Sequence, residues 1–132
     1  MNYFKTAAAG VLVLLWHPVW AAGEVESVSF SEQVMPLLMR ECSYCHMRED
    51  SYGYLVFEPD NTLGNLVNVP AFAYPQMMRV QPGSPDQSYL WKKLTGEHLQ
   101  LGAEGWLMPY FRWPDNNLEL VRSWIEQGAL DN

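Results

Sequence analysis

The chain is poor in cysteine and histidine, which limits the metal sites that it can hold. It has two cysteines and three histidines, and both cysteines lie in one short segment. A structural zinc site needs about four ligands, and outside that segment His98 is the one histidine in the part expected to fold. No cysteine follows the apolar run near the start, so a bacterial lipid-attachment site is lacking. Neither a zinc centre nor a lipid anchor is expected.

Basic residues are also few. Eight lysines and arginines stand against 15 acidic residues, giving a net charge of −7. Loss of an N-terminal segment that holds Lys5 and no acid would make this about −8. Such a surface repels phosphate backbones, so nucleic acid is not an expected partner. A basic protein partner is compatible with it, because opposite fields speed encounter. Solubility alone would explain the charge equally well.

The first 22 residues predict a secretory signal peptide. Lys5 is the only charge before an apolar run, and Val19-Trp20-Ala21 places a small residue before an expected cut. The run is broken by a histidine and a proline and is shorter than the roughly 20 residues of a spanning helix. We therefore expect residues 1–22 to be removed on export to the periplasm, leaving 23–132 as one domain. An uncleaved membrane anchor is the alternative.

Hydrophobic spacing predicts an all-α domain of about four helices joined by long loops. Apolar residues recur at three- and four-residue steps, and no clear strand alternation is present. Ser84-Pro85-Asp86-Gln87 predicts a capping box at a helix start. The expected helices run from near Ser31 to Cys42, over 61–67, from Ser84 to Gly96, and from Pro114, with Asp115 or Asn116 as the cap, to Gly128. Long loops are unusual in a small domain, and they become reasonable when they wrap a cofactor.

One segment, Cys42-Ser43-Tyr44-Cys45-His46, carries a specific chemical pattern. Two cysteines two residues apart, followed at once by histidine, are the attachment pattern of c-type haem. Each thiol forms a thioether with one vinyl group of the porphyrin, and His46 then lies under the iron as its proximal ligand. The segment predicts one covalently bound haem c, held by Cys42, Cys45 and His46.

Three other interpretations of the cysteine pair each meet an objection. A disulfide suits an oxidising compartment, but this pair would close a very small loop. A thioredoxin-like redox pair follows a strand, whereas a helix is expected before Cys42. A zinc site lacks enough ligands.

Met108 is the expected sixth ligand of the iron. Methionine in this position raises the reduction potential relative to a second histidine. Pro109 restricts the backbone of Met108, and nearby aromatic residues would wall an apolar crevice: Trp106, Tyr110, Phe111 and Trp113. Met77, Met78, His98 and an open position remain alternatives. Met35 and Met39 are expected in the core at helical spacing, and Met47 adjoins His46 too closely to reach the opposite face.

With these residues in hand, the chain resembles class I-like monohaem cytochromes c, and in particular planctomycete-type cytochrome c domains. The resemblance spans residues 30–129. It rests on the haem motif and on five further segments: Val80-Gln81-Pro82-Gly83-Ser84-Pro85-Asp86, Ser88-Tyr89-Leu90, Leu94-Thr95-Gly96, Met108-Pro109 and Trp124-Ile125-Glu126-Gln127-Gly128-Ala129. It implies an all-α fold whose first and last helices cross beside the haem, with His46 and Met108 as axial ligands.

The expected function is transfer of single electrons between exported or membrane redox proteins, as a free carrier or as a subunit of a larger oxidoreductase complex. No catalytic residue is required. A haem-based sensor and a small peroxidase-like haem enzyme are the alternatives, and both need an open sixth position. Arg79 is expected at the surface, with a haem propionate contact as the less favoured alternative.

Overall fold

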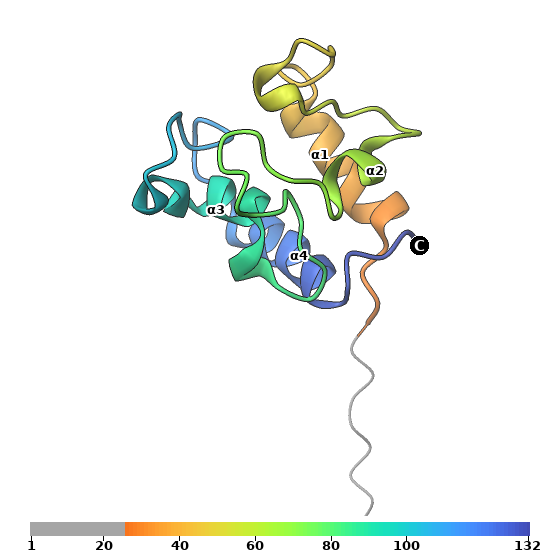
Figure 1. The fold of residues 1–132 in the computed structure, drawn as a ribbon. Coiled ribbons are helices and arrows are strands. Elements are labelled where there is room, and N and C mark those ends of the chain that lie inside the picture. The colour runs from red at the N-terminus through yellow and green to blue at the C-terminus, as the bar shows by residue number, and fades with distance from the viewer. Residues whose placement is uncertain (1–25) are drawn as a thin grey trace, which may run out of the picture.

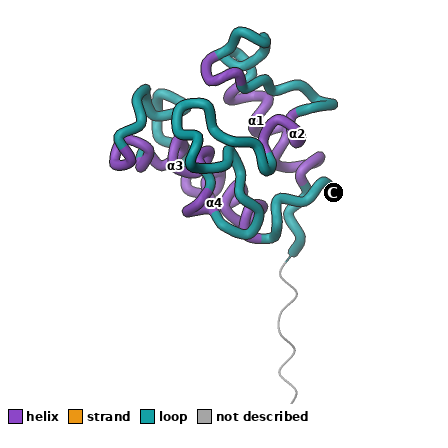
Figure 2. Tube along the Cα trace, in the orientation of Figure 1, coloured by secondary structure: helices purple, strands orange, loops and turns teal. Residues whose placement is uncertain are grey.

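Helices joined by long loops make up the fold (Figures 1 and 2). The computed structural model describes residues 26–132, so the predicted signal peptide and its cut lie outside the described residues. The α-helices are α1 (Met35–Cys42), α2 (Thr62–Leu66), α3 (Tyr89–Thr95) and α4 (Asp115–Glu126). Shorter π- or 3₁₀-helical turns are η1 (Phe30–Val34), η2 (Tyr52–Tyr54), η3 (Pro85–Gln87) and η4 (Glu97–Leu101).

Extended backbone segments contribute little to the structure of the described residues. Within residues 26–132 they form isolated bridges only, which pair Val67 with Val80, Pro70 with Met78, and Met78 with Ser88. The predicted all-α class is therefore confirmed. None of the described helices has the length and apolar character that a membrane crossing requires.

The first helical segment forms as its sequence predicts. The Ser29 hydroxyl accepts a hydrogen bond from the Glu32 backbone N–H at 3.1 Å, which caps η1. Pro36 is the second residue of α1, which continues directly from the π-helical turn η1, so the change of helix type falls where the proline N–H is missing. The helix then runs to Cys42, the first residue of the haem motif.

The predicted capping box at Ser84 is wrong. The Ser84 side chain makes no capping bond, and a single 3₁₀ turn, η3, precedes α3. Ser88 takes over the polar contacts of this turn, since its hydroxyl accepts from the Gln81 N–H at 2.9 Å and donates to the Ser84 carbonyl at 2.9 Å. The turn is thereby fixed without the box, and α3 begins only at Tyr89. Its predicted end at Gly96 is confirmed, with φ of +82°.

The last helix also lacks its predicted side-chain cap. Pro114 occupies the cap position of α4, and neither Asp115 nor Asn116 serves as the cap. The helix closes as expected at Gly128, which has φ of +103°.

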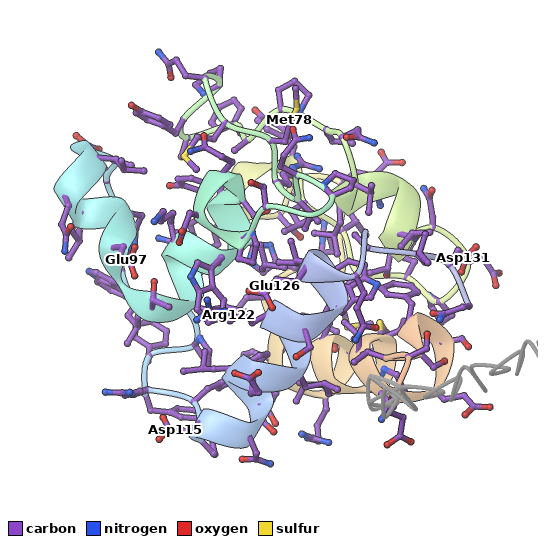
Figure 3. The ribbon with its side chains drawn as sticks, turned by 90° about the horizontal axis from the view of Figure 1, so that it is seen from below. Met78, Glu97, Asp115, Arg122, Glu126 and Asp131 are labelled. Carbon is purple, nitrogen blue, oxygen red and sulfur yellow. The ribbon has the colours of Figure 1, made fainter. Side chains whose placement is uncertain are left out.

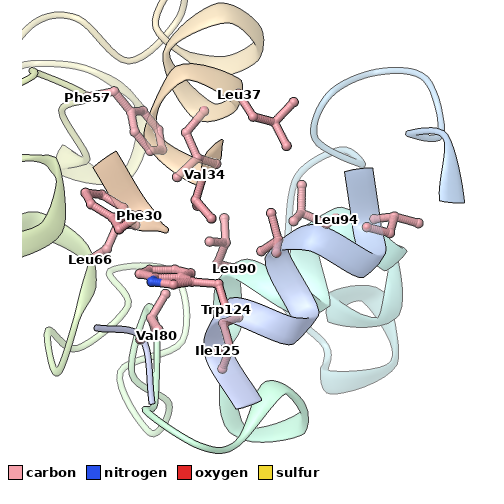
Figure 4. Close-up of a cluster of buried hydrophobic side chains, with 14 of the residues drawn as sticks. Phe30, Val34, Leu37, Phe57, Leu66, Val80, Leu90, Leu94, Trp124 and Ile125 are labelled. Atoms are coloured by element: carbon pink, nitrogen blue, oxygen red, sulfur yellow. The ribbon is translucent and has the colours of Figure 1, made fainter. Parts of the chain in front are cut away.

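One apolar core joins the first and last helical segments (Figure 4). The rings of Phe30 in η1 and Trp124 in α4 stack with centroids 5.1 Å apart. Met35 and Met39 are partly buried against this core, which confirms their predicted packing role. The buried members are Phe30, Val34, Leu37, Leu38, Phe57, Leu66, Val80, Leu90, Leu94, Trp113, Leu118, Val121, Trp124, Ile125 and Ala129.

Replacing Trp124 by alanine is expected to lower the free energy of unfolding by about 3–5 kcal/mol. The side chain is 1% exposed, and its indole N–H donates to the Leu130 carbonyl at 3.0 Å. Urea unfolding followed by circular dichroism measures the change. Trp106→Ala is the matched control, because that side chain is 67% exposed, and it should change stability by about 0.5 kcal/mol or less. Equal losses in the two variants would contradict the position of Trp124 in the core.

The two ends of the described chain are tied together. The Asn132 carbonyl accepts from the backbone N–H of Ser31 at 3.1 Å and from the Ser29 hydroxyl at 2.8 Å. The Asn132 side chain accepts from the Phe30 N–H at 2.9 Å, and Gln127 accepts from the Val28 N–H at 2.8 Å. The segment that leads into η1 is thus closed by residues about a hundred positions later in the chain.

Candidate functional site

The haem motif begins at Cys42, the last residue of α1, and continues on the turn that follows. The N–H of Cys45 donates to the Cys42 carbonyl at 3.2 Å, and the N–H of His46 donates to the carbonyls of Cys42 and Ser43 at 3.1 and 3.0 Å. Both cysteines are free thiols, Cys42 half-buried and Cys45 exposed. The structure therefore brings both thiols and the imidazole onto one tight turn of backbone.

The His46 ring is held in one orientation and one tautomer. Its Nδ1 lies 3.1 Å from the carbonyl oxygen of Leu55. Because a carbonyl only accepts, Nδ1 carries the hydrogen and Nε2 keeps its lone pair. The His46 carbonyl accepts from the Phe57 N–H at 2.7 Å, and the Phe57 ring meets the imidazole edge-on. Among the described residues no hydrogen-bond partner occupies Nε2. This arrangement leaves Nε2 available to a metal.

Burial lowers the pKa of His46 below its ordinary value of 6.5. The positive charges of Arg79 and Lys93 lower it further, while the Leu55 carbonyl acts in the opposite direction. The neutral imidazole, which is the ligating form, therefore predominates at neutral pH.

Cys42 is a poor candidate for thiol–disulfide chemistry. Burial, with smaller contributions from Glu41 and Cys45, raises the pKa of its thiol to about 12. A reactive redox cysteine needs a lowered pKa, so the thioredoxin-like interpretation loses support. Residues 26–132 also contain no cluster of three histidine, cysteine or acidic side chains that would hold a metal ion by themselves.

In the folded, haem-free chain we expect iodoacetamide to modify Cys45 at least about tenfold faster than Cys42 at pH 8. At that pH a pKa of about 12 leaves about one Cys42 thiolate in 10,000, and Cys45 is exposed. Mass-spectrometric mapping of the alkylated peptides measures both rates. In denaturant the two rates should converge, and equal rates in the folded chain would contradict the burial of Cys42.

Met108 lies half-buried in the loop between η4 and α4, where its N–H donates to the Lys93 carbonyl at 3.3 Å. No hydrogen bond or ring contact within the described residues joins Met108 to His46, so its assignment as sixth ligand stays a prediction. Lys93 interacts with the loop that carries Met108 and also influences His46. Its ammonium donates to the Trp106 carbonyl at 2.6 Å beside Met108, and its charge acts on His46.

The aromatic residues around Met108 do not form a closed wall. Trp106, Tyr110 and Phe111 are exposed, and Trp113 alone is buried in the core. A cavity of about 310 Å³ lies beside this loop, lined by Leu94, Thr95, Glu97, Leu107, Arg112 and Leu118. Its lining includes Leu107, which precedes Met108, but none of the four predicted haem-binding residues.

Two of the alternative ligands, Met77 and His98, are engaged elsewhere. Met77 is buried in a second apolar cluster with Ala71, Tyr89 and Ala103. His98 is fully buried, with Nε2 3.0 Å from the Gly105 carbonyl and Nδ1 3.3 Å from the Lys92 carbonyl. Both ring nitrogens of His98 therefore face backbone oxygens rather than an open site.

Two cationic side chains act on His46, of which one was expected at the surface and the other escaped the sequence prediction. Arg79, expected at the surface, is half-buried and donates to the carbonyls of Asn65, Gly53 and Tyr54 at 2.7, 2.9 and 3.1 Å. Lys93 was not singled out, although it lies four residues after Tyr89 on the apolar side of α3, and it is 8% exposed. A lysine at a buried helical position was the one signal in the sequence that pointed to it.

Comparison with models of protein families, with curated proteins and with solved structures found no match. The site is therefore interpreted from its own residues. Its donors fit one covalently attached haem, because two unpaired thiols and an imidazole with a free Nε2 lie on one turn.

Proposed function

We propose that this chain is an exported c-type cytochrome that carries single electrons between redox partners. One haem c would be attached through Cys42 and Cys45, and His46 and Met108 would ligate its iron, in a class I cytochrome c-like fold with long loops. The observation that carries the proposal is the hydrogen bond from His46 Nδ1 to the Leu55 carbonyl. His46 lies on the same turn as the two free thiols. It orients the imidazole for a metal at Nε2.

When bound, haem supplies an iron that takes up and gives back one electron. The residues of the chain have separate tasks in this proposal. The thiols of Cys42 and Cys45 fix the porphyrin edge, and the Leu55 carbonyl holds the proximal imidazole. Met108, as the sixth ligand, would raise the reduction potential relative to a second histidine. No side chain has to move a proton, so the site needs no acid–base residue.

A haem-based sensor and a peroxidase-like enzyme are the alternatives. Both need an open sixth position, and a peroxidase also needs a distal acid–base group. His98 is the one histidine besides His46 within residues 26–132, and backbone carbonyls lie against both of its ring nitrogens. The carrier interpretation needs no such group.

The proposal is tested by producing the full chain in a bacterium with a c-type haem maturation system. We expect the periplasmic fraction to contain a protein that stains for haem on a denaturing gel and titrates as a one-electron couple. The oxidised form should show a methionine–iron charge-transfer band and resist cyanide. Absence of bound haem would overturn the proposal, and immediate binding of cyanide or carbon monoxide would favour the sensor or enzyme.

A further inference from the structure

The loop that carries Met108 is held to the rest of the domain at few points. Residues 104–106 of this loop are exposed, and the side chain of Trp106 is 67% exposed. Three hydrogen bonds join residues 104–111 to other parts of the described chain, and all three come from α3 or from the turn η4 that follows it. Because residues 104–106 bury little surface, these bonds largely determine where the loop lies.

Two of these bonds come from buried side chains and reach consecutive carbonyls. His98 in η4 is fully buried, and its Nε2 lies 3.0 Å from the Gly105 carbonyl oxygen. Lys93 in α3 is 8% exposed, and its ammonium donates to the Trp106 carbonyl at 2.6 Å. The third bond runs from the Met108 N–H to the Lys93 carbonyl at 3.3 Å. The backbone is therefore held at three of the four positions from Gly105 to Met108.

Gly105 is the residue at which these side chains approach the loop most closely. Its φ of +96° is a conformation that residues with a Cβ rarely adopt. A Cβ built at this position would lie 3.4 Å from Nζ of Lys93. The absence of a side chain on Gly105 thus lets the loop backbone reach both buried donors.

The turn that carries His98 is itself fixed on two sides. Glu97, the first residue of η4 (Figure 3), accepts from the Lys92 ammonium of α3 at 2.6 Å. The His98 carbonyl accepts from the Ala103 N–H at 3.2 Å, and Ala103 is buried in the second apolar cluster. The imidazole therefore extends to the loop from a turn that has its own support.

The two ring nitrogens of His98 make unequal contacts. Nε2 lies 3.0 Å from the Gly105 carbonyl oxygen, and Nδ1 lies 3.3 Å from that of Lys92. A carbonyl only accepts, and a neutral imidazole has a single N–H. The shorter contact assigns this hydrogen to Nε2, so that the imidazole donates to the loop.

We propose that His98 is a positioning residue for the sixth ligand. Its Nε2–H, together with the Lys93 ammonium, fixes the loop backbone just before Met108 and so holds the methionine side chain ready for the iron. A histidine that does not touch the metal then governs how firmly the methionine stays in place. This inference rests on the proposed function, and in particular on Met108 as a ligand.

The test is the rate at which cyanide replaces Met108 in the oxidised holo-protein, followed as loss of the methionine–iron charge-transfer band. Cyanide enters the sixth position only while the methionine is displaced, so the rate reports how often the loop moves away. Replacing the Nε2–H donor should raise this rate by about tenfold, because a buried hydrogen bond to the loop is lost.

Two amide replacements separate the bond to the loop from the contact with α3. The amide N–H of His98→Gln can take the place of Nε2–H, whereas that of His98→Asn can take only the place of Nδ1. We expect His98→Gln to stay within about twofold of the parent and His98→Asn to show the tenfold rise. A role in packing alone would not give this order. Equal rates in the two variants would overturn the inference.

Ile125→Val is the matched control for a general loss of stability. Its side chain is fully buried in the main core, on α4, so the variant loses stability without touching the loop. It should leave the cyanide rate unchanged. A second readout, independent of cyanide, is hydrogen exchange of the Met108 N–H by NMR of the reduced holo-protein. Exchange should quicken by about tenfold in His98→Asn, and it should stay at the parental rate in His98→Gln and in Ile125→Val.

Failure of the inference is distinguishable from failure of the proposed function. If a denaturing gel shows no bound haem, both fall. If the parent has the charge-transfer band but neither cyanide replacement nor Met108 exchange responds to His98→Asn, the positioning role alone is overturned. Should His98→Asn not fold, His98→Leu takes its place, since leucine suits the buried site and also lacks the donor, and the same rise is expected.

Discussion

A chain in which serine replaces both Cys42 and Cys45 is expected to carry no haem on a denaturing gel. Each thiol adds across one vinyl group of the porphyrin, and a serine hydroxyl does not form this thioether. Without either bond, haem would be held only by iron ligation and packing, both of which denaturant removes. Haem staining and intact mass of the purified chains measure the expected complete loss.

Single replacements and a neighbouring control sharpen this test. Cys42→Ser and Cys45→Ser should each keep one thioether and so retain reduced staining. Ser43→Ala, on the same turn, should stain like the parent. Full staining in the double variant would show that the cysteines do not hold the haem. Recovery of an intramolecular disulfide in the parent would support the disulfide alternative instead.

Met108→Ala is expected to abolish the methionine–iron charge-transfer band and to lower the midpoint potential by more than about 0.1 V. Methionine ligation raises the potential of haem iron, and axial ligands set haem potentials over a range of about 0.8 V. The variant should also bind cyanide or carbon monoxide at once, because its sixth position would be open or weakly filled. Visible spectroscopy and a redox titration measure these changes.

Met77→Ala and Met78→Ala are the controls for this assignment. Met77 is buried in the second apolar cluster, so its loss should reduce stability but leave the charge-transfer band in place. Met78 is half-buried, and its carbonyl accepts from the Tyr89 N–H. An unchanged band in Met108→Ala would remove Met108 as ligand, and loss of the band in either control would transfer the role to that residue.

The helices were largely predictable because their signals are local. Residues a few positions apart determine three of these features. They are the helical run of η1 and α1 up to Cys42, the end of α3 at Gly96 and the end of α4 at Gly128. The capping box at Ser84 failed because a nearby residue makes competing bonds to the same turn. The Ser88 hydroxyl bonds the backbone of Gln81 and Ser84 and so fixes the turn by other means.

The surroundings of the haem motif were much less predictable. The motif itself is visible in five consecutive residues, but the Leu55 carbonyl that orients His46 carries no side-chain signal at all. Arg79 reaches carbonyls 14 to 26 positions earlier in the chain. Such contacts depend on how the loops fold back. The spacing of residues along the sequence does not reveal this. The relation of Met108 to His46 stays a prediction for the same reason.

The tie between the two ends of the described chain has a consequence for the order of events in the cell. Because Asn132 closes the segment around Ser29 and Ser31, this packing is completed only after Asn132 has been synthesised and, under the proposed export, translocated. Contacts between such distant positions slow folding, because a long loop has to be closed before they form. The turn at Cys42 and Cys45 emerges long before that closure. An enzyme that attaches haem would therefore meet a chain that has not finished folding. The domain would then pack around a haem that is already attached.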